Sequence, residues 1–135
     1  MKRKNITYNQ PLENEIGFSR AVRIENTIAV SATAPIADDG TVYASGDVAR
    51  QTERCFDIIE DVIEKAGSSR ENVIRTRIYL TDIKRWKEAA TVHGEYFSNV
   101  KPACGFIGVS GFINPEWLVE IEADCVLKIN NINKS

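Results

Sequence analysis

Hydrophobic residues along this chain follow two different periods, which predicts a mixture of strands and helices. Residues 18–24 (FSRAVRI) and 27–33 (TIAVSAT) are rich in apolar and β-branched residues, and a Glu-Asn pair lies between them. Because Asn tolerates the left-handed backbone of a tight turn, the two runs predict a β-hairpin. A weaker strand is indicated at residues 5–9, and the stretch 34–46, with its Pro, Asp and Gly residues, is typical of a loop.

A helix is predicted after Asp47, whose side chain can cap the first turn. From Val48 to Ala66 the apolar residues are spaced three or four apart, as they are on one face of a helix. Gly67 follows as a stop signal. The segment SSRE, residues 68–71, matches a capping box and predicts one further helical turn.

The second half of the chain predicts three strands and another helix. VIRTRIYLT, residues 73–81, alternates in the manner of a half-buried strand. A helix is expected from about residue 82 to 97, and strands at 103–109 and in LVEIEADCVL, residues 118–127. The order β-β-α-β-α-β-β predicts one α+β domain over residues 1–135, in which two helices cover one face of a sheet.

Alternation and helical spacing also assign side chains to faces. In the strand at 73–81, the side chains expected under the helices are Ile74, Thr76, Ile78 and Leu80. The apolar stripe expected on the second helix is Ile83, Trp86, Ala90, His93 and Phe97. The other face of the sheet is expected to carry Arg75, Arg77, Tyr79, Phe106, Glu120 and Glu122. If the charged strands are neighbours, each opposite-charge pair contributes roughly 0.2–1 kcal/mol. Such a face is equally consistent with a subunit interface and with a solvated surface.

Composition narrows the class of protein. The 135 residues are 43% hydrophobic and carry a net charge of −2 with no basic stripe, so we expect a core and no nucleic-acid binding. No apolar run approaches the ~18 residues of a membrane span, and no signal peptide is indicated, so we expect no membrane partner and a cytoplasmic location. The cysteines, Cys55, Cys104 and Cys125, have no CxxC spacing, which predicts reduced thiols and no metal site.

Several of these stretches together resemble the RidA/YjgF family. They are the order of elements, the helix ending in Ala-Gly, RTRIYLTDI, the pair Pro102-Ala103 and the closing LVEIEA, and the match covers roughly residues 16 to 128. The resemblance implies a chorismate-mutase-like fold and a homotrimer with a central barrel and three intersubunit clefts. Its best-known members hydrolyse reactive enamines and imines, such as 2-aminoacrylate, to ammonia and a 2-keto acid, and we expect no cofactor for this chain. Others are described as ribonucleases, translation inhibitors or chaperones, so the fold does not fix the activity.

Carried over by position, the cleft is expected to contain Phe18, Ser31, Cys104 and Glu120. In the deaminating members, an arginine follows Pro-Ala and binds the substrate carboxylate through a bidentate pair. This chain has Cys104 there, and Phe18 replaces a tyrosine. The resemblance therefore implies either hydrolysis of a small imine or enamine, or a non-catalytic trimer that binds a metabolite or a partner. Ribonuclease activity is the weakest alternative, because the chain has one histidine and no basic face.

Each candidate residue has a structural alternative. Glu120 is either a general base that activates water or a charge partner for an arginine. Cys104 would need a lowered pKa to act as a nucleophile, and no base adjoins it in sequence, so a pocket-lining role is favoured. His93, on an apolar stripe, is expected to be packed rather than catalytic. Arg20 is a candidate to bind the substrate carboxylate in place of the missing arginine. Phe18 is equally consistent with a cleft wall and with ordinary packing.

Overall fold

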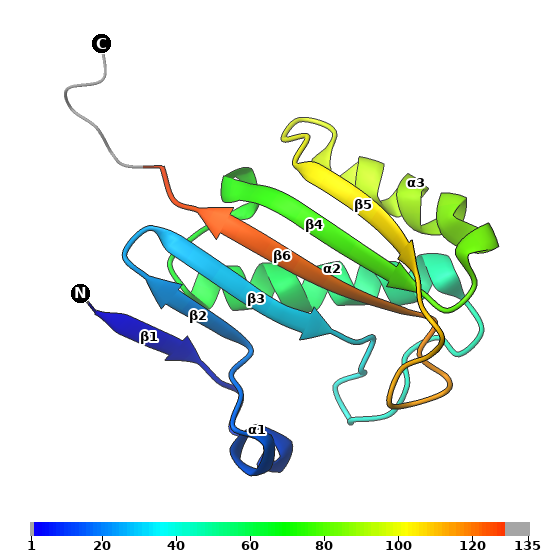
Figure 1. Ribbon diagram of the computed structural model, residues 1–135, viewed down its shortest axis with the longest axis horizontal. Coiled ribbons are helices and arrows are strands. Elements are labelled where there is room, and N and C mark those ends of the chain that lie inside the picture. The colour runs from blue at the N-terminus through cyan, green and yellow to red at the C-terminus, as the bar shows by residue number, and fades with distance from the viewer. Residues whose placement is uncertain (1, 129–135) are drawn as a thin grey trace.

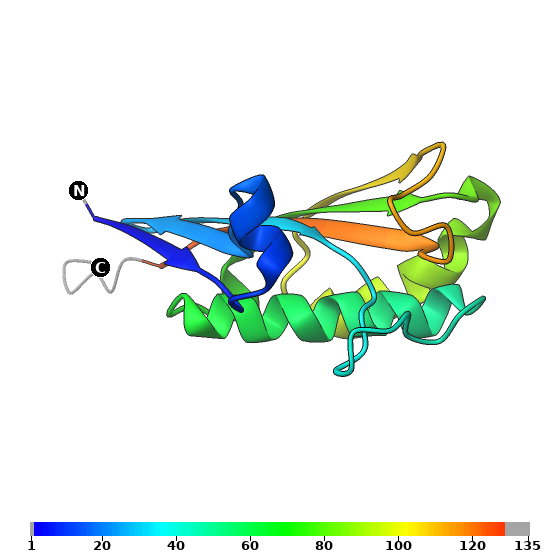
Figure 2. The same ribbon diagram turned by 90° about the horizontal axis from the view of Figure 1, so that it is seen from below.

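The computed structural model describes residues 2–128 and shows one sheet with two helices along the same face (Figures 1 and 2). The strands are β1 (Arg3–Ile6), β2 (Ala21–Ile24), β3 (Thr27–Thr33), β4 (Val73–Leu80), β5 (Ala103–Gly108) and β6 (Val119–Val126). The helices are α1 (Pro11–Ile16), α2 (Val48–Lys65) and α3 (Trp86–Phe97), with short 3-10 turns at Arg70–Asn72 and Ile83–Arg85. The strand order is β1-β2-β3-β6-β4-β5. The α+β class predicted from the sequence is confirmed.

Chain direction in the sheet follows from the connections. The tight turn after β2 makes β2 and β3 antiparallel, and β6 returns between β3 and β4, antiparallel to both. The crossover through α3 makes β5 parallel to β4, as a helical connection allows. Strand β5 therefore lies at one edge of the sheet and β1 at the other.

Helix α2 begins and ends where the sequence predicts. The Asp47 carboxylate accepts a hydrogen bond from the backbone N–H of Arg50 at 3.0 Å, which satisfies one free donor of the first turn. Gly67 ends the helix with a φ of +89°, and a Cβ there would lie 2.6 Å from Nη1 of Arg23. The helical turn predicted at residues 68–71 is present as the 3-10 turn Arg70–Asn72, but its capping box is not, because the turn begins after Ser69 and this side chain makes no capping bond.

The core lies between the sheet and the two helices. Its fully buried side chains from β4 and β6 include Ile78, Leu80, Val119 and Ile121. Those of α2 include Phe56, Val62 and Ile63. This layer fixes which face of the sheet is covered, and the opposite face of β4 and β6 is left to polar side chains.

Three local predictions are wrong. A bulge between Val73 and Arg75 shifts the register of β4, so Val73 is buried and Ile74 is 51% exposed. Phe106 is the partner of Ile78 in the parallel pair, so it faces the helices and contacts Trp86, with ring centroids 5.6 Å apart. The first strand lies at 3–6 rather than 5–9, and α1 was not predicted.

The stripe predicted on the second helix is only partly correct. Phe97 is buried, but the other fully buried positions of α3 are Ala89 and Val92. Ile83 and Trp86 are 43% and 41% exposed. The 3-10 turn at residues 83–85 takes Ile83 out of the helical spacing, and Trp86 lies at the first position of α3.

Ile78→Ala and Ile74→Ala test this register. Ile78 is fully buried at the centre of the sheet, so its truncation leaves a cavity and should lower the free energy of unfolding by about 2–5 kcal/mol. Ile74→Ala should cost less than about 1 kcal/mol, because this side chain is half exposed. Urea unfolding followed by circular dichroism measures both values. Equal costs would contradict the bulge.

Candidate functional site

The open face of the sheet carries a network of charges between β4 and β6. Nη1 of Arg77 lies 3.3 Å from the Asp124 carboxylate and 3.8 Å from that of Glu122. Nε of Arg75 lies 3.9 Å from Asp124, and the Tyr79 hydroxyl donates to Glu122. The expectation that opposite charges pair across neighbouring strands is therefore confirmed. Because these side chains are partly exposed, each pair contributes at most about 1 kcal/mol.

Glu120 differs from the other acids of β6. Its carboxylate has no hydrogen bond or ion pair within residues 2–128, because Arg75 and Arg77 pair with Glu122 and Asp124 instead. Glu120 is therefore not the charge partner of Arg75 or Arg77 that the sequence left open. Partial burial raises the pKa of Glu120, the positive charge of Arg20 lowers it, and the negative charge of Glu122 raises it. The result is a half-buried carboxylate with free acceptor capacity.

Ser31 is engaged in the fold. Its hydroxyl donates to the carbonyl oxygen of Ser19 at 2.5 Å, next to the point where β3 departs from regular pairing with β6. The bond joins the start of β2 to the neighbouring strand. The hydroxyl proton of Ser31 is therefore used in a hydrogen bond to the backbone.

Cys104 lies apart from Glu120 within one chain. It is a free, exposed thiol on β5, and its partner in the parallel pair is Thr76, which points under α3. Glu120 is the partner of Tyr79 on the open face. The two predicted site residues therefore lie on opposite faces of the sheet and are separated by β4, so a single chain does not bring them together.

His93 is packed, as the sequence predicts. Its Nε2 lies 2.8 Å from the hydroxyl of Thr76, and its ring contacts Phe56 and Phe97 with centroids 5.7 and 4.9 Å away. Burial lowers the pKa of His93, which keeps the imidazole neutral. Within residues 2–128, no three His, Cys, Asp or Glu side chains converge in a way that could hold a metal ion.

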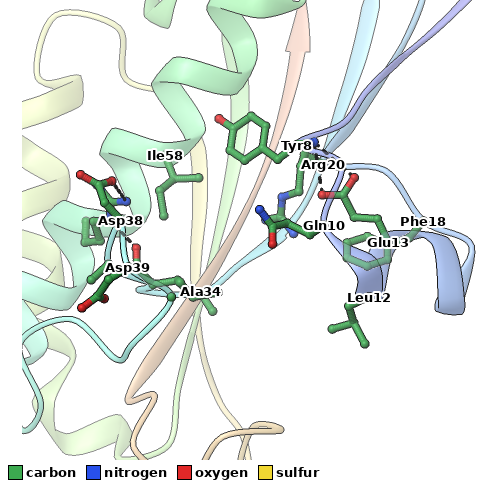
Figure 3. A pocket seen from close by; sticks show the side chains of 14 residues that line it. Tyr8, Gln10, Leu12, Glu13, Phe18, Arg20, Ala34, Asp38, Asp39 and Ile58 are labelled. Carbon is green, nitrogen blue, oxygen red and sulfur yellow. Dashed lines mark hydrogen bonds and ion pairs between the residues drawn. The ribbon is translucent and has the colours of Figure 1, made fainter.

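A cavity of about 490 Å³ opens between α1, the 34–40 loop and α2 (Figure 3). Of the predicted site residues, Phe18 lines it, whereas Ser31, Cys104 and Glu120 do not. Arg20, the candidate replacement for the missing arginine, also lines it and so points into the cavity rather than toward Cys104. No motif in the sequence pointed to Tyr8, Glu13 or Arg54, which contribute polar groups to the lining. They come from segments that only the folded chain brings together.

Comparison with known proteins shows which family has this arrangement. The architecture is that of an α+β protein with helices on one face of its sheet, and residues 8–127 match the family model described as Endoribonuclease L-PSP. A RutC family protein from Pyrococcus abyssi is 31% identical over 121 residues, covering 89% of this chain and 94% of its own. An uncharacterized protein from Streptomyces coelicolor is also 31% identical over 121 residues, covering 90% of each chain.

A solved structure supports the same assignment. The crystal structure of a member of the YjgF/YER057c/UK114 family from Mycobacterium tuberculosis is 36% identical, with a TM-score of 0.84. The match covers 93% of this chain and 100% of the chain in that structure. The chain therefore belongs to the Endoribonuclease L-PSP family, which is the YjgF/RidA family. No helix among residues 2–128 is long and apolar enough to cross a membrane.

The raised pKa of Glu120 predicts a specific pH dependence of stability. Because the folded-state pKa lies above the unfolded value of about 4.3, the folded state binds more protons between these two values. The free energy of unfolding should therefore fall as pH rises through this window. Glu120→Gln, which cannot ionise, should lack this component when unfolding is measured between pH 4 and 8.

Arg20→Gln provides the complementary measurement. Removal of this positive charge should raise the pKa of Glu120 further, because Arg20 favours the ionised carboxylate. NMR titration of the side-chain carboxyl carbon measures the pKa directly. A Glu120 pKa at or below 4.3 in the unmodified protein would contradict the desolvation argument.

Proposed function

We propose that this chain hydrolyses small imines or enamines, with Glu120 as the group that activates water. The observation that supports the proposal most is the free, half-buried carboxylate of Glu120. It matches the position of the family's catalytic acid, whereas the neighbouring acids on its strand are paired. Burial raises the pKa of Glu120, which makes it a stronger base than an exposed carboxylate.

The proposed reaction is balanced without a cofactor. Glu120 takes a proton from water while the water oxygen attacks the imine carbon, and its protonated carboxyl passes that proton to the imine nitrogen, which gives a neutral carbinolamine. Glu120 then takes the proton of the new hydroxyl and passes it to the amine nitrogen. As the C=O double bond forms, the C–N bond breaks, and the products are ammonia and a carbonyl compound. An enamine enters the same route after tautomerisation, in which its carbon accepts a proton and its nitrogen loses one.

The proposed cleft requires more than one copy of the chain. Cys104 and Glu120 lie on opposite faces of one sheet, so a single cleft can contain both only if Cys104 comes from a neighbouring subunit. The homotrimer that the family resemblance implies would supply this second copy. Edge strand β5, with Ile107 at 39% exposure, offers a surface for such a contact. A native mass of three times 15.1 kDa by light scattering is the result expected.

Cys104 bears on the choice of substrate. A thiol cannot form the bidentate pair that an arginine forms with a carboxylate, so the proposed substrate lacks a carboxylate at this position or binds it elsewhere. A non-catalytic binding role is the second candidate, and the same substitution favours it. Ribonuclease activity has less support, since the single histidine is packed and neutral.

Glu120→Gln should reduce hydrolysis of an imine by roughly 10²–10⁴-fold in kcat/KM, the usual size of a general-base contribution. The assay generates 2-aminoacrylate enzymatically and follows ammonia and pyruvate, and a set of imines without a carboxylate is tested in parallel. Glu95→Gln, which changes an exposed glutamate on α3, is the matched control and should leave the rate unchanged.

Cys104→Arg tests whether an arginine at this position restores binding of the substrate carboxylate. If Glu120 is competent and only the carboxylate contact has been lost, Cys104→Arg should raise turnover of 2-aminoacrylate, and this gain should disappear in the double variant with Glu120→Gln. Cys104→Ala controls for loss of the thiol. If no imine is hydrolysed by the unmodified protein or by Cys104→Arg, the catalytic proposal is wrong, and a thermal shift with ligand but without product would then favour binding.

A further inference from the structure

The cavity beside α1 has apolar walls and one cation without a full set of partners. Leu12 of α1, Phe18 and Ile58 of α2 supply apolar surface around it (Figure 3). Its volume of about 490 Å³ is in the range of sites that enclose a small organic molecule. Such sites combine apolar walls with a few polar groups that fix the orientation of the ligand.

Arg20 is held in place by its backbone. Its N–H donates to the carbonyl oxygen of Ile6 at 2.8 Å, and its own carbonyl accepts from the N–H of Ser31 at 2.9 Å. Residue 20 is thus fixed between β1 and β3, and its side chain extends into the cavity (Figure 3). The guanidinium lies over the ring of Phe18, 5.6 Å from the centroid, which orients it further.

The guanidinium of Arg20 has unused donors. Within residues 2–128, its one side-chain hydrogen bond is a long contact of 3.4 Å from Nη2 to the hydroxyl of Thr33, and it forms no ion pair. A guanidinium has five N–H donors in a planar fork. Burial lowers the pKa of Arg20, yet arginine remains charged. A mostly desolvated cation therefore faces an open space with most of its donors free.

The other charged groups around the cavity are engaged. Arg54 donates to the carbonyl of Ile36 at 2.6 Å and pairs with Asp38 at 3.0 Å. The carboxylate of Asp39 accepts two hydrogen bonds from Thr41 at the exposed rim.

Among the neighbouring charges, Glu13 has the largest electrostatic effect on the pKa of Arg20. It is buried and accepts hydrogen bonds from the hydroxyl of Thr7 and the N–H of Tyr8. Its negative charge helps to keep Arg20 ionised without forming a direct pair with it. Arg20 is therefore the group best placed to receive an anion in this cavity.

We infer that the cavity between α1, the 34–40 loop and α2 binds a small carboxylate with an apolar body, and that Arg20 anchors the carboxylate. The planar fork of arginine matches the two oxygens of a carboxylate, and a bidentate pair is stronger where water is excluded. The body of the ligand would lie against Leu12, Phe18 and Ile58. The inference goes beyond the proposed hydrolysis and does not depend on it, because Glu120 does not line the cavity.

The test uses 3-phenylpropionate and its uncharged amide, 3-phenylpropionamide, measured by isothermal titration calorimetry with the intact protein. These probes have nearly the same shape, so a difference between them reports the charge. We expect the carboxylate to bind at least tenfold more tightly than the amide. Neither probe has a C=N bond, and Glu120→Gln, which removes a negative charge that acts on Arg20, should bind the acid at least as tightly as the unmodified protein does. Failure of this inference is therefore distinguishable from failure of the catalytic proposal.

Arg20→Gln should weaken binding of the acid by roughly ten- to a hundredfold and leave that of the amide unchanged, as expected for loss of a hydrogen bond to a charged group. The matched control is Arg50→Gln, because Arg50 is an exposed arginine of α2 outside the cavity lining. It should bind both probes normally.

Ala37→Leu keeps Arg20 but fills part of the cavity, and it should weaken both probes. Equal affinity for acid and amide, undiminished binding by Arg20→Gln, or no binding of the acid up to about 10 mM would each overturn the inference.

Discussion

The pairing of β4 with β6 at the centre of the sheet is the constraint on which the rest of this structure depends. One face of the pair buries Ile78 and Ile121 against the helices, and this burial fixes the register. A slip by one residue would expose these side chains and bury their charged neighbours, at a cost of several kcal/mol for each charge left unpaired. The polar positions of both strands are thereby aligned on the other face.

This alignment distributes the charges unequally. Arg77 has two acidic neighbours within 4 Å, Glu122 and Asp124, whereas Glu120 lies toward the end of the network and has no ion-pair partner among residues 2–128. Its partial burial is a consequence of the same sheet, so the position that raises its pKa also leaves it free to contact water or a ligand. The pairing that stabilises β4 and β6 is thus also what leaves one carboxylate available on a surface otherwise neutralised by ion pairs.

The sheet also separates two kinds of site. The open face carries Glu120, and β5, with Cys104, is displaced to the edge, so chemistry that involves both requires a neighbouring subunit. The cavity beside α1 is complete within one chain, with Arg20 and Phe18 on one side and α2 on the other. The proposed cleft would thus depend on assembly, whereas the residues that line the cavity all come from one chain. Substitution of Cys104 would act on the proposed cleft, whereas substitution of Arg20 would change the cavity directly and would act on Glu120 through the loss of its charge.

Most elements of this fold follow from the properties of single residues and from short patterns in the sequence. Asp47 and Gly67 bound α2 because capping and positive φ are properties of single residues, and the alternation in LVEIEA predicts which side chains of β6 are buried.

Features that depend on contacts between distant segments were missed or wrong. Ile74 is exposed because of a bulge, and Phe106 faces α3 because of its register with β4. By itself the sequence determined most of the elements and the family. Only the tertiary structure decided where Arg20 points and that Cys104 lies far from Glu120, because both depend on which strands become neighbours.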